Sequence, residues 1–115
     1  MALRVAKAIG DKKGLEVRVL DVCRVCGFAD FFVLATGASA RHVRALADAA
    51  IAAALRAGAA PKGVEGKTVA GWVLVDLGDV VVHVFQEDER DFFGLERLWG
   101  DAEELAVERA VSAAS

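Results

Sequence analysis

The sequence contains no hydrophobic run long enough to cross a membrane. Its longest apolar runs have the length of a strand, whereas a membrane-spanning helix needs about 20 predominantly apolar residues. The segment Met1–Gly10 is too short and too polar for a signal peptide. We therefore expect a cytoplasmic protein that does not associate with membranes.

A basic stripe of the kind that binds phosphate backbones is also missing. Lys and Arg number 14 against 17 Asp and Glu, which gives a net charge of −3. The local basic cluster is thin and consists of Arg41, His42 and Arg44. Because binding to nucleic acid through phosphates relies on Lys and Arg, the composition disfavours direct binding to DNA or rRNA. An acidic domain is better suited to a basic protein partner.

Cysteine is scarce, and the two residues present, Cys23 and Cys26, form one Cys-x-x-Cys pair. A structural zinc ion needs four ligands, and the remaining soft ligands, His42 and His83, have no matching spacing. A thioredoxin-like pair would open a helix, whereas this pair ends a predicted strand and is followed by Gly27. We interpret the pair as incidental and predict neither a metal nor a cofactor.

The residues that are present form helical and strand patterns sufficient for one domain. A chain of 115 residues with 56% apolar content has room for a single domain with its own core. Helical spacing predicts helices over Ala2–Gly10 and Ala40–Ala57, and Ser39 suits the N-cap of the second. The second helix carries an apolar stripe: Val43, Leu46, Ala47, Ala50, Ile51, Ala54 and Leu55.

Four segments have strand patterns: Leu15–Val22, Phe31–Thr36, Gly71–Leu77 and Asp79–Phe85. The tight turn Gly78-Asp79 predicts that the last two form a hairpin. Helical patterns return from Glu87 and over Asp101–Ala114. The order α-β-β-α-β-β-α-α predicts an α/β fold in which helices flank a single mixed sheet.

The first candidate for chemistry is the turn Gly37-Ala38-Ser39, because backbone amides before a helix can hold a phosphate. Asp76 and Asp79 are the matching candidates for metal ligands. However, such a turn is mostly a helix cap, and aspartates beside a hairpin are favoured by turn geometry alone. No Lys or Arg clamp converges with them. A nucleotidyltransferase-like enzyme is therefore kept only as the alternative function.

Neither histidine supports a catalytic interpretation. His42 lies in the first turns of a predicted helix, and His83 lies in the middle of a predicted strand, where a packed residue is expected. No Ser–His–Asp order is readable. We predict that the protein has no catalytic residues.

Trp72 is the strongest candidate for recognition. Alternation along its strand places Trp72, Leu74 and Asp76 on one face and Val73, Val75 and Leu77 on the other. A large aromatic beside a charge is typical of an interface anchor. The alternative, that the sheet is covered on both faces and Trp72 belongs to the core, stays open. The helical spacing of Trp99 from Phe92 and Leu95 favours core packing for Trp99.

Five blocks, in this order, resemble the ribosomal silencing factor family, also called the Iojap family: Phe28–Gly37, Ser39–Asp48, Gly63–Gly66, Trp72–Phe85 and Leu95–Trp99. The resemblance runs from the first helix to Trp99. It does not cover the segment after Gly100, and the Cys23–Cys26 pair departs from the family pattern.

The resemblance implies a nucleotidyltransferase-like fold without that enzyme's catalytic residues, over residues 1–100, followed by a C-terminal helical tail over 101–115. It implies binding to the large ribosomal subunit through ribosomal protein L-fourteen, which hinders joining of the small subunit and represses translation. The family's partner-binding tryptophan falls on Trp72, with Leu74 and Asp76 as companions. Free members of the family are often homodimers.

Overall fold

The computed structural model describes residues 1–24, 27–66 and 71–87, and the backbone of residues 103–105. This part of the chain forms two helices and six strands: α1 (Ala2–Asp11), β1 (Leu15–Asp21), β2 (Phe31–Gly37), α2 (Ala40–Arg56), β3 (Gly63–Glu65), β4 (Trp72–Asp76), β5 (Val80–Gln86) and β6 (Glu103–Leu105). The predicted α/β class is confirmed.

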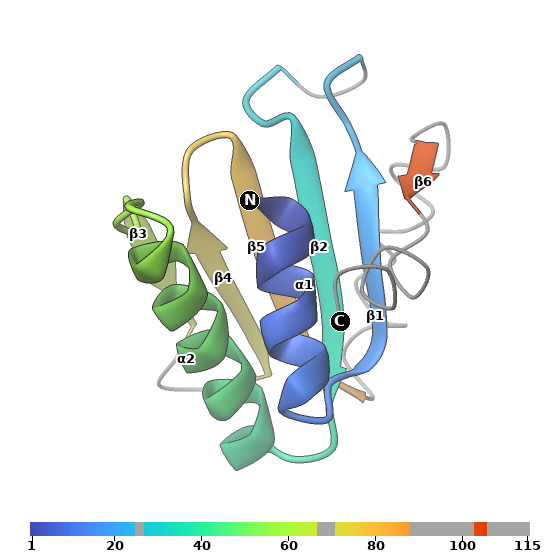
Figure 1. Cartoon of the computed structure of the whole chain (residues 1–115). Helices are drawn as coiled ribbons and strands as arrows, with labels where there is room; N and C mark the ends of the chain where they lie inside the picture. Colours follow the sequence, from blue (N-terminus) through green and yellow to red (C-terminus); the bar gives the residue numbers. More distant parts are fainter. Residues whose placement is uncertain (25–26, 67–70, 88–102, 106–115) are drawn as a thin grey trace.

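All six strands share one sheet, in the order β3-β4-β5-β2-β1-β6 (Figure 1). The sheet is mixed, because β2 and β5 run parallel while the other neighbours are antiparallel. The parallel pair lies in the middle of the sheet and is buried along almost its whole length, which is why both strands read as continuous apolar runs.

The hairpin predicted at Gly78-Asp79 is present. Strands β4 and β5 pair antiparallel, and the Leu77 N–H donates to the Val80 carbonyl at 2.9 Å across the turn. The four predicted strands therefore share a sheet, as the sequence patterns indicate.

Both described helices cover the same face of this sheet (Figure 1). They bury Ala and branched aliphatic side chains against Val19, Val33, Val73, Val82 and their neighbours. Ser39 caps α2, since its Oγ accepts the His42 N–H at 3.1 Å. In the described part of the chain, neither helix is long and apolar enough to span a bilayer.

One residue of the apolar stripe predicted for α2 is exposed and not buried. Leu55 is 55% exposed, although the sequence pattern assigns it to the buried side. With 3.6 residues per turn, Leu55 lies about 120° around the helix from Val43, whose side chain is fully buried. The stripe that packs on the sheet is thus centred on Val43, Leu46 and Ala50.

Gly37 lets the end of β2 pack directly onto α2. A Cβ atom at this position would lie 2.7 Å from Val43 Cγ2 and 2.8 Å from Val43 N. Any larger residue would push the first turn of α2 away from the sheet. Close packing of strand and helix is therefore a sufficient reason for glycine at the start of the candidate phosphate turn.

The short edge strand β3 was not predicted. Its residues, Gly63–Glu65, pair with β4 but are all exposed, so they carry no apolar pattern. The sequence patterns predict neither a helix nor a strand here, between Ala57 and Gly71. Only pairing with the edge of β4 makes it a strand.

The other edge strand, β6, overturns a prediction. Glu103–Leu105 pairs antiparallel with β1, so the helix predicted over Asp101–Ala114, and with it the helical tail over 101–115, is wrong at these three residues. Glu and Leu are good helix formers, and the pairing with β1 overrides that preference. The rest of this segment, and Trp99 with its predicted helical neighbours, lie outside the described residues, and the domain boundary at residue 100 stays a prediction.

Candidate functional site

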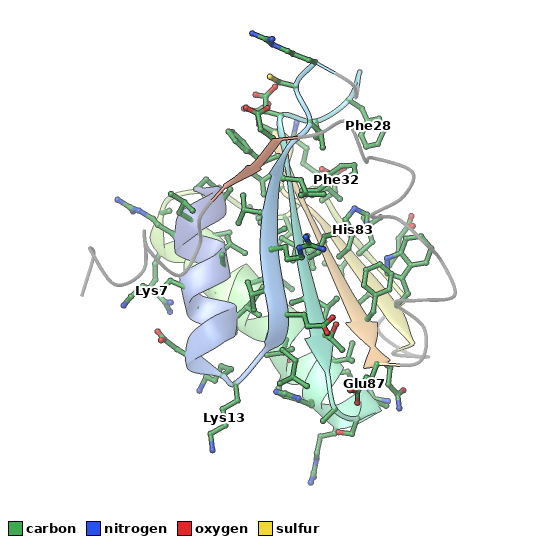
Figure 2. The ribbon with its side chains drawn as sticks, turned by 90° about the vertical axis from the view of Figure 1, so that its right-hand side faces the viewer. Lys7, Lys13, Phe28, Phe32, His83 and Glu87 are labelled. Atoms are coloured by element: carbon green, nitrogen blue, oxygen red, sulfur yellow. The ribbon has the colours of Figure 1, made fainter. Side chains whose placement is uncertain are left out.

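The candidate site is the face of the sheet opposite α1 and α2, which we call the aromatic face. Figure 2 shows two of its members, Phe32 and His83, on the side of the sheet away from α1. The face consists of His83 and a buried apolar cluster with two half-buried residues packed against it: Leu20, Val22, Ala29, Phe32, Leu34, Val81 and Phe85, with Trp72 and Leu74.

Strand β4 alternates as its sequence predicts. Val73 and Val75 are fully buried on the helix side, and Leu77 packs with them. Trp72, Leu74 and Asp76 are half-buried on the aromatic face. The three candidate partner-binding residues thus share one face of one strand, although their role in binding stays a prediction.

Two side chains of β5 hold the Trp72 indole. Its ring stacks on Phe85, with centroids 5.3 Å apart and planes 28° apart. Its Nε1–H donates a hydrogen bond to Nδ1 of His83 at 3.2 Å. Trp72 is therefore half-buried, between the two alternatives that the sequence leaves open, an interface anchor and a core residue.

His83 is the most unusual polar residue of this face. It is only 5% exposed, and the Phe32 ring packs edge-on against it at a centroid distance of 4.8 Å. Burial lowers the pKa of His83 to about 4, so the ring is neutral at pH 7. Because Nδ1 accepts the Trp72 N–H, Nε2 carries the proton. This Nε2 is buried and has no hydrogen-bond partner among the described residues.

The prediction of a packed histidine at position 83 is confirmed, but its bond to Trp72 was missed. Cross-strand pairing sets Leu74 opposite His83 and Trp72 opposite Phe85. Trp72 therefore reaches His83 along the diagonal of the hairpin, a distance that aromatic side chains span. The turn at Gly78-Asp79 was the available signal, since the hairpin register follows from it.

Of the two aspartates beside the hairpin turn, Asp76 bonds within the turn and Asp79 bonds through its backbone to the start of β2. Asp76 Oδ1 accepts the Gly78 N–H at 2.8 Å, and the Asp79 carbonyl accepts the N–H groups of Asp30 and Phe31. Within the residues described, no group of three or more His, Cys, Asp or Glu side chains is arranged to hold a metal ion. Turn geometry accounts for Asp76 without a metal.

The polar groups of the candidate phosphate turn, Gly37-Ala38-Ser39, form hydrogen bonds with other groups of the chain. The Ala38 N–H donates to His42 Nδ1 at 2.9 Å, and the ring's other nitrogen, Nε2, is 2.9 Å from the Lys12 carbonyl, to which it donates. Ser39 Oγ is occupied by its capping bond. His42 thus joins this turn to the end of α1, and the turn serves as a helix cap.

Cys23 follows the end of β1 and is exposed. Its N–H donates to Asp21 Oδ1 at 3.1 Å, and a hydrogen bond from its thiol to Asp21 raises the pKa of Cys23. A raised pKa disfavours the thiolate, which is the form that binds metals. Cys26 lies outside the described residues, so the absence of a metal at this pair stays a prediction.

Both the sequence and the fold of this chain are similar to those of known proteins. The family model described as "Ribosomal silencing factor during starvation" matches residues 1–115. This chain belongs to the ribosomal silencing factor family. The resemblance seen in the sequence is confirmed, and the match continues past Gly100, where that resemblance ended.

Several bacterial proteins are similar to this chain over most of their length. The ribosomal silencing factor of Halalkalibacterium halodurans is 44% identical over 105 residues, which cover 91% of this chain and 90% of that protein. The Bacillus subtilis factor is 45% identical over 97 residues, or 84% of this chain and 82% of the relative. A crystal structure from Chromobacterium violaceum, 40% identical, superposes with a TM-score of 0.81 over 84% of this chain and 80% of that chain.

Proposed function

We propose that this protein is a cytoplasmic ribosomal silencing factor that docks on the large ribosomal subunit through ribosomal protein L-fourteen. Once bound, it prevents the small subunit from joining and so represses translation, with no chemical step. Membership of the ribosomal silencing factor family supports the class of function. The observation that carries the proposal is the position of Trp72, a half-buried aromatic held beside Leu74 and Asp76 on one face of the sheet.

The chemistry of this face suits a basic protein partner. Trp72 and Leu74 supply apolar area of the kind found in interface anchors. Asp76 lies on the same face, and Glu65, an exposed residue opposite Leu74 in the register, adds a second carboxylate on β3. From Trp72 to Asp76 the strand extends about 13 Å. An aromatic centre with acidic neighbours attracts and orients a partner that carries Lys and Arg.

The size of the domain suits a steric mechanism. The molecule has a radius of gyration of 12.7 Å and extends 30 × 30 × 27 Å. A body of this size at the rim of the subunit interface clashes with an incoming small subunit whatever its chemistry. Inhibition should therefore be stoichiometric and reversible.

A subunit-joining assay with titrated protein tests the proposal. We expect inhibition to saturate near one copy per large subunit and to reverse on dilution. Trp72→Ala should weaken binding to isolated L-fourteen by more than about 2 kcal/mol, the usual threshold for an interface hot spot, while the protein stays folded. Leu55→Ala is the matched control, because Leu55 is an exposed apolar residue on the helix side and its loss should leave binding unchanged.

The same assay separates silencing from catalysis. Inhibition at far less than one copy per subunit, or inhibition that requires nucleotide and magnesium, would support the nucleotidyltransferase alternative instead. Full activity of the Trp72→Ala variant would show that docking uses another surface.

We further propose that the free protein forms a homodimer, as the family resemblance implies. Sedimentation velocity over a range of concentrations measures this directly. A species of monomer mass at every concentration would reject the dimer and leave the docking proposal intact.

A further inference from the structure

The hydrogen bond between Trp72 and His83 joins the candidate anchor to a buried residue that no interpretation of the sequence connects with it. We propose that His83 is a positioning residue, whose neutral imidazole holds the Trp72 indole in the orientation that the partner recognises. This inference rests on the proposed function and adds to it a residue that acts on the partner through Trp72.

Two contacts together define the orientation of the indole. Stacking on Phe85 sets the plane of the ring but does not by itself select which edge of the indole faces the sheet. The bond from Nε1–H to His83 Nδ1 makes that selection, because the N–H is on one edge only. An anchor held in this way loses less side-chain freedom on binding, which favours affinity.

The packing around His83 leaves its Nδ1 able to accept the hydrogen bond from Trp72. The ring is 5% exposed, and its direct neighbours in the register are Leu74 on β4 and Leu34 on β2. Among the described residues, strand pairing also places charged groups on this face, none of them a direct register partner of His83: Asp76 on β4, Glu65 on β3 and Arg18 on β1. Burial lowers the pKa of His83 to about 4, so Nδ1 keeps its lone pair at neutral pH.

The other ring nitrogen of His83 makes histidine costly at this position. His83 Nε2–H is buried without an acceptor among the described residues, and such a group is unfavourable. A phenyl ring at this position would pack against Phe32 and Phe85 without that penalty. What histidine offers here and phenylalanine does not is the acceptor at Nδ1, which Trp72 uses.

Nuclear magnetic resonance of the indole N–H tests the positioning directly. The chain has two tryptophans, so Trp99→Phe leaves Trp72 as the single indole signal. At pH 7 we expect this N–H to exchange slowly with solvent and to shift only when the pH falls well below 6. His83→Phe should shift the signal and speed its exchange. His83→Asn, which returns an acceptor oxygen near the place of Nδ1, should restore the protection in part.

Binding to L-fourteen tests the consequence. His83→Phe should weaken binding roughly fivefold to tenfold, the size expected for losing one hydrogen bond, and His83→Asn should recover most of the loss. In a Trp72→Phe background, which has no indole N–H, adding His83→Phe should change affinity less than about twofold, because the two residues then have nothing to couple. Thermal melts establish that each variant is folded.

The outcomes distinguish this inference from the proposed function. If Trp72→Ala abolishes binding while His83→Phe binds like the original protein, the positioning role is wrong and the docking role of Trp72 stands. An indole signal unchanged by His83→Phe overturns the positioning role outright. If the indole signal behaves as expected but the unaltered protein does not bind L-fourteen, the hold of His83 on Trp72 stands and the proposed partner is wrong.

Discussion

The two faces of the sheet are built from different kinds of side chain. Against α1 and α2 the strands present valines and alanines that are almost completely buried, among them Val33, Val73 and Val82. The aromatic face presents Phe32, His83 and Phe85, with Trp72 half-buried at the side of β4. One face is mostly aliphatic and buried, and the other combines rings, a buried polar group and partial exposure.

This difference reflects two physical tasks. Alanine and β-branched residues let helices approach the pleated surface closely and lose little side-chain freedom, so the helix side contributes mainly to stability. Aromatic rings bring large area with few rotatable bonds and a polar group that can be directed, so they suit recognition. We infer that substitutions on the helix side change stability alone, whereas substitutions on the aromatic face also change binding and, at His83, the dependence of stability on pH.

The largest effect is expected on the helix side. Leu46 is fully buried between α2 and the sheet, so Leu46→Ala should lower the free energy of unfolding by about 2–5 kcal/mol. The folded fraction should bind L-fourteen with unchanged affinity. Urea denaturation measures the first quantity and a binding titration the second.

The control for Leu46 is Leu55 on the same helix. Leu55 is 55% exposed, so Leu55→Ala should change stability by less than about 0.5 kcal/mol. Equal losses in the two variants would mean that the helix side does not carry the core, and the contrast between the faces would fail.

The second effect belongs to the aromatic face and depends on pH. The pKa of His83 is about 4 in the folded protein and about 6.5 in an unfolded chain, so between these values the unfolded state binds more protons. The contribution of neutral His83 to the free energy of unfolding should be fully present above about pH 6.5. It should fall as the pH drops, by roughly 3 kcal/mol at pH 4. Urea denaturation at a series of pH values measures this loss.

His83→Phe isolates that contribution from the carboxyl groups that titrate in the same range. The variant should lack the part of the pH dependence that lies between about pH 6.5 and 4, because it has no group to protonate there. Identical pH profiles for the two proteins would contradict the buried, neutral state of His83.

A smaller effect is expected at the edge of the aromatic face. Gly66 has a φ of 81°, and a Cβ atom there would collide with the Trp72 carbonyl. Gly66→Ala should therefore cost about 1–3 kcal/mol of stability and displace the start of β4, with a loss of affinity for L-fourteen. Thermal melts and binding titrations measure the two effects.

Gly10→Ala is the opposite case on the helix side. Gly10 lies inside α1, and a Cβ atom there would meet nothing within 4 Å. Alanine should stabilise the helix by roughly 0.5–1 kcal/mol and leave binding unchanged. A gain of affinity in Gly10→Ala beside the loss in Gly66→Ala would show that binding follows stability and not the position of Trp72.

Local sequence patterns predicted the long elements well and the edges poorly. The capping Ser39, the apolar run of β2 and the alternation of β4 are each signals within a few residues, and each was confirmed. The two three-residue strands carry no such signal. β3 is exposed. The Glu-Glu-Leu sequence of β6 favours a helix, and only its pairing with the edge of β1 makes it a strand.

The sequence by itself determined that Trp72, Leu74 and Asp76 share a face, because side chains alternate along any strand whatever its neighbours. It also determined family membership, since the matching blocks lie along the chain in order. Only the tertiary structure decided what lies beside them. The register of β4 on β5 sets the Trp72 indole against Phe85 and within reach of His83, and the parallel pairing of β5 with β2 brings Phe32 to the same ring. The turn at Gly78-Asp79 indicates the register of this hairpin. Strand order and the packing of rings from different strands depend on contacts between distant segments, and no local pattern contains those contacts.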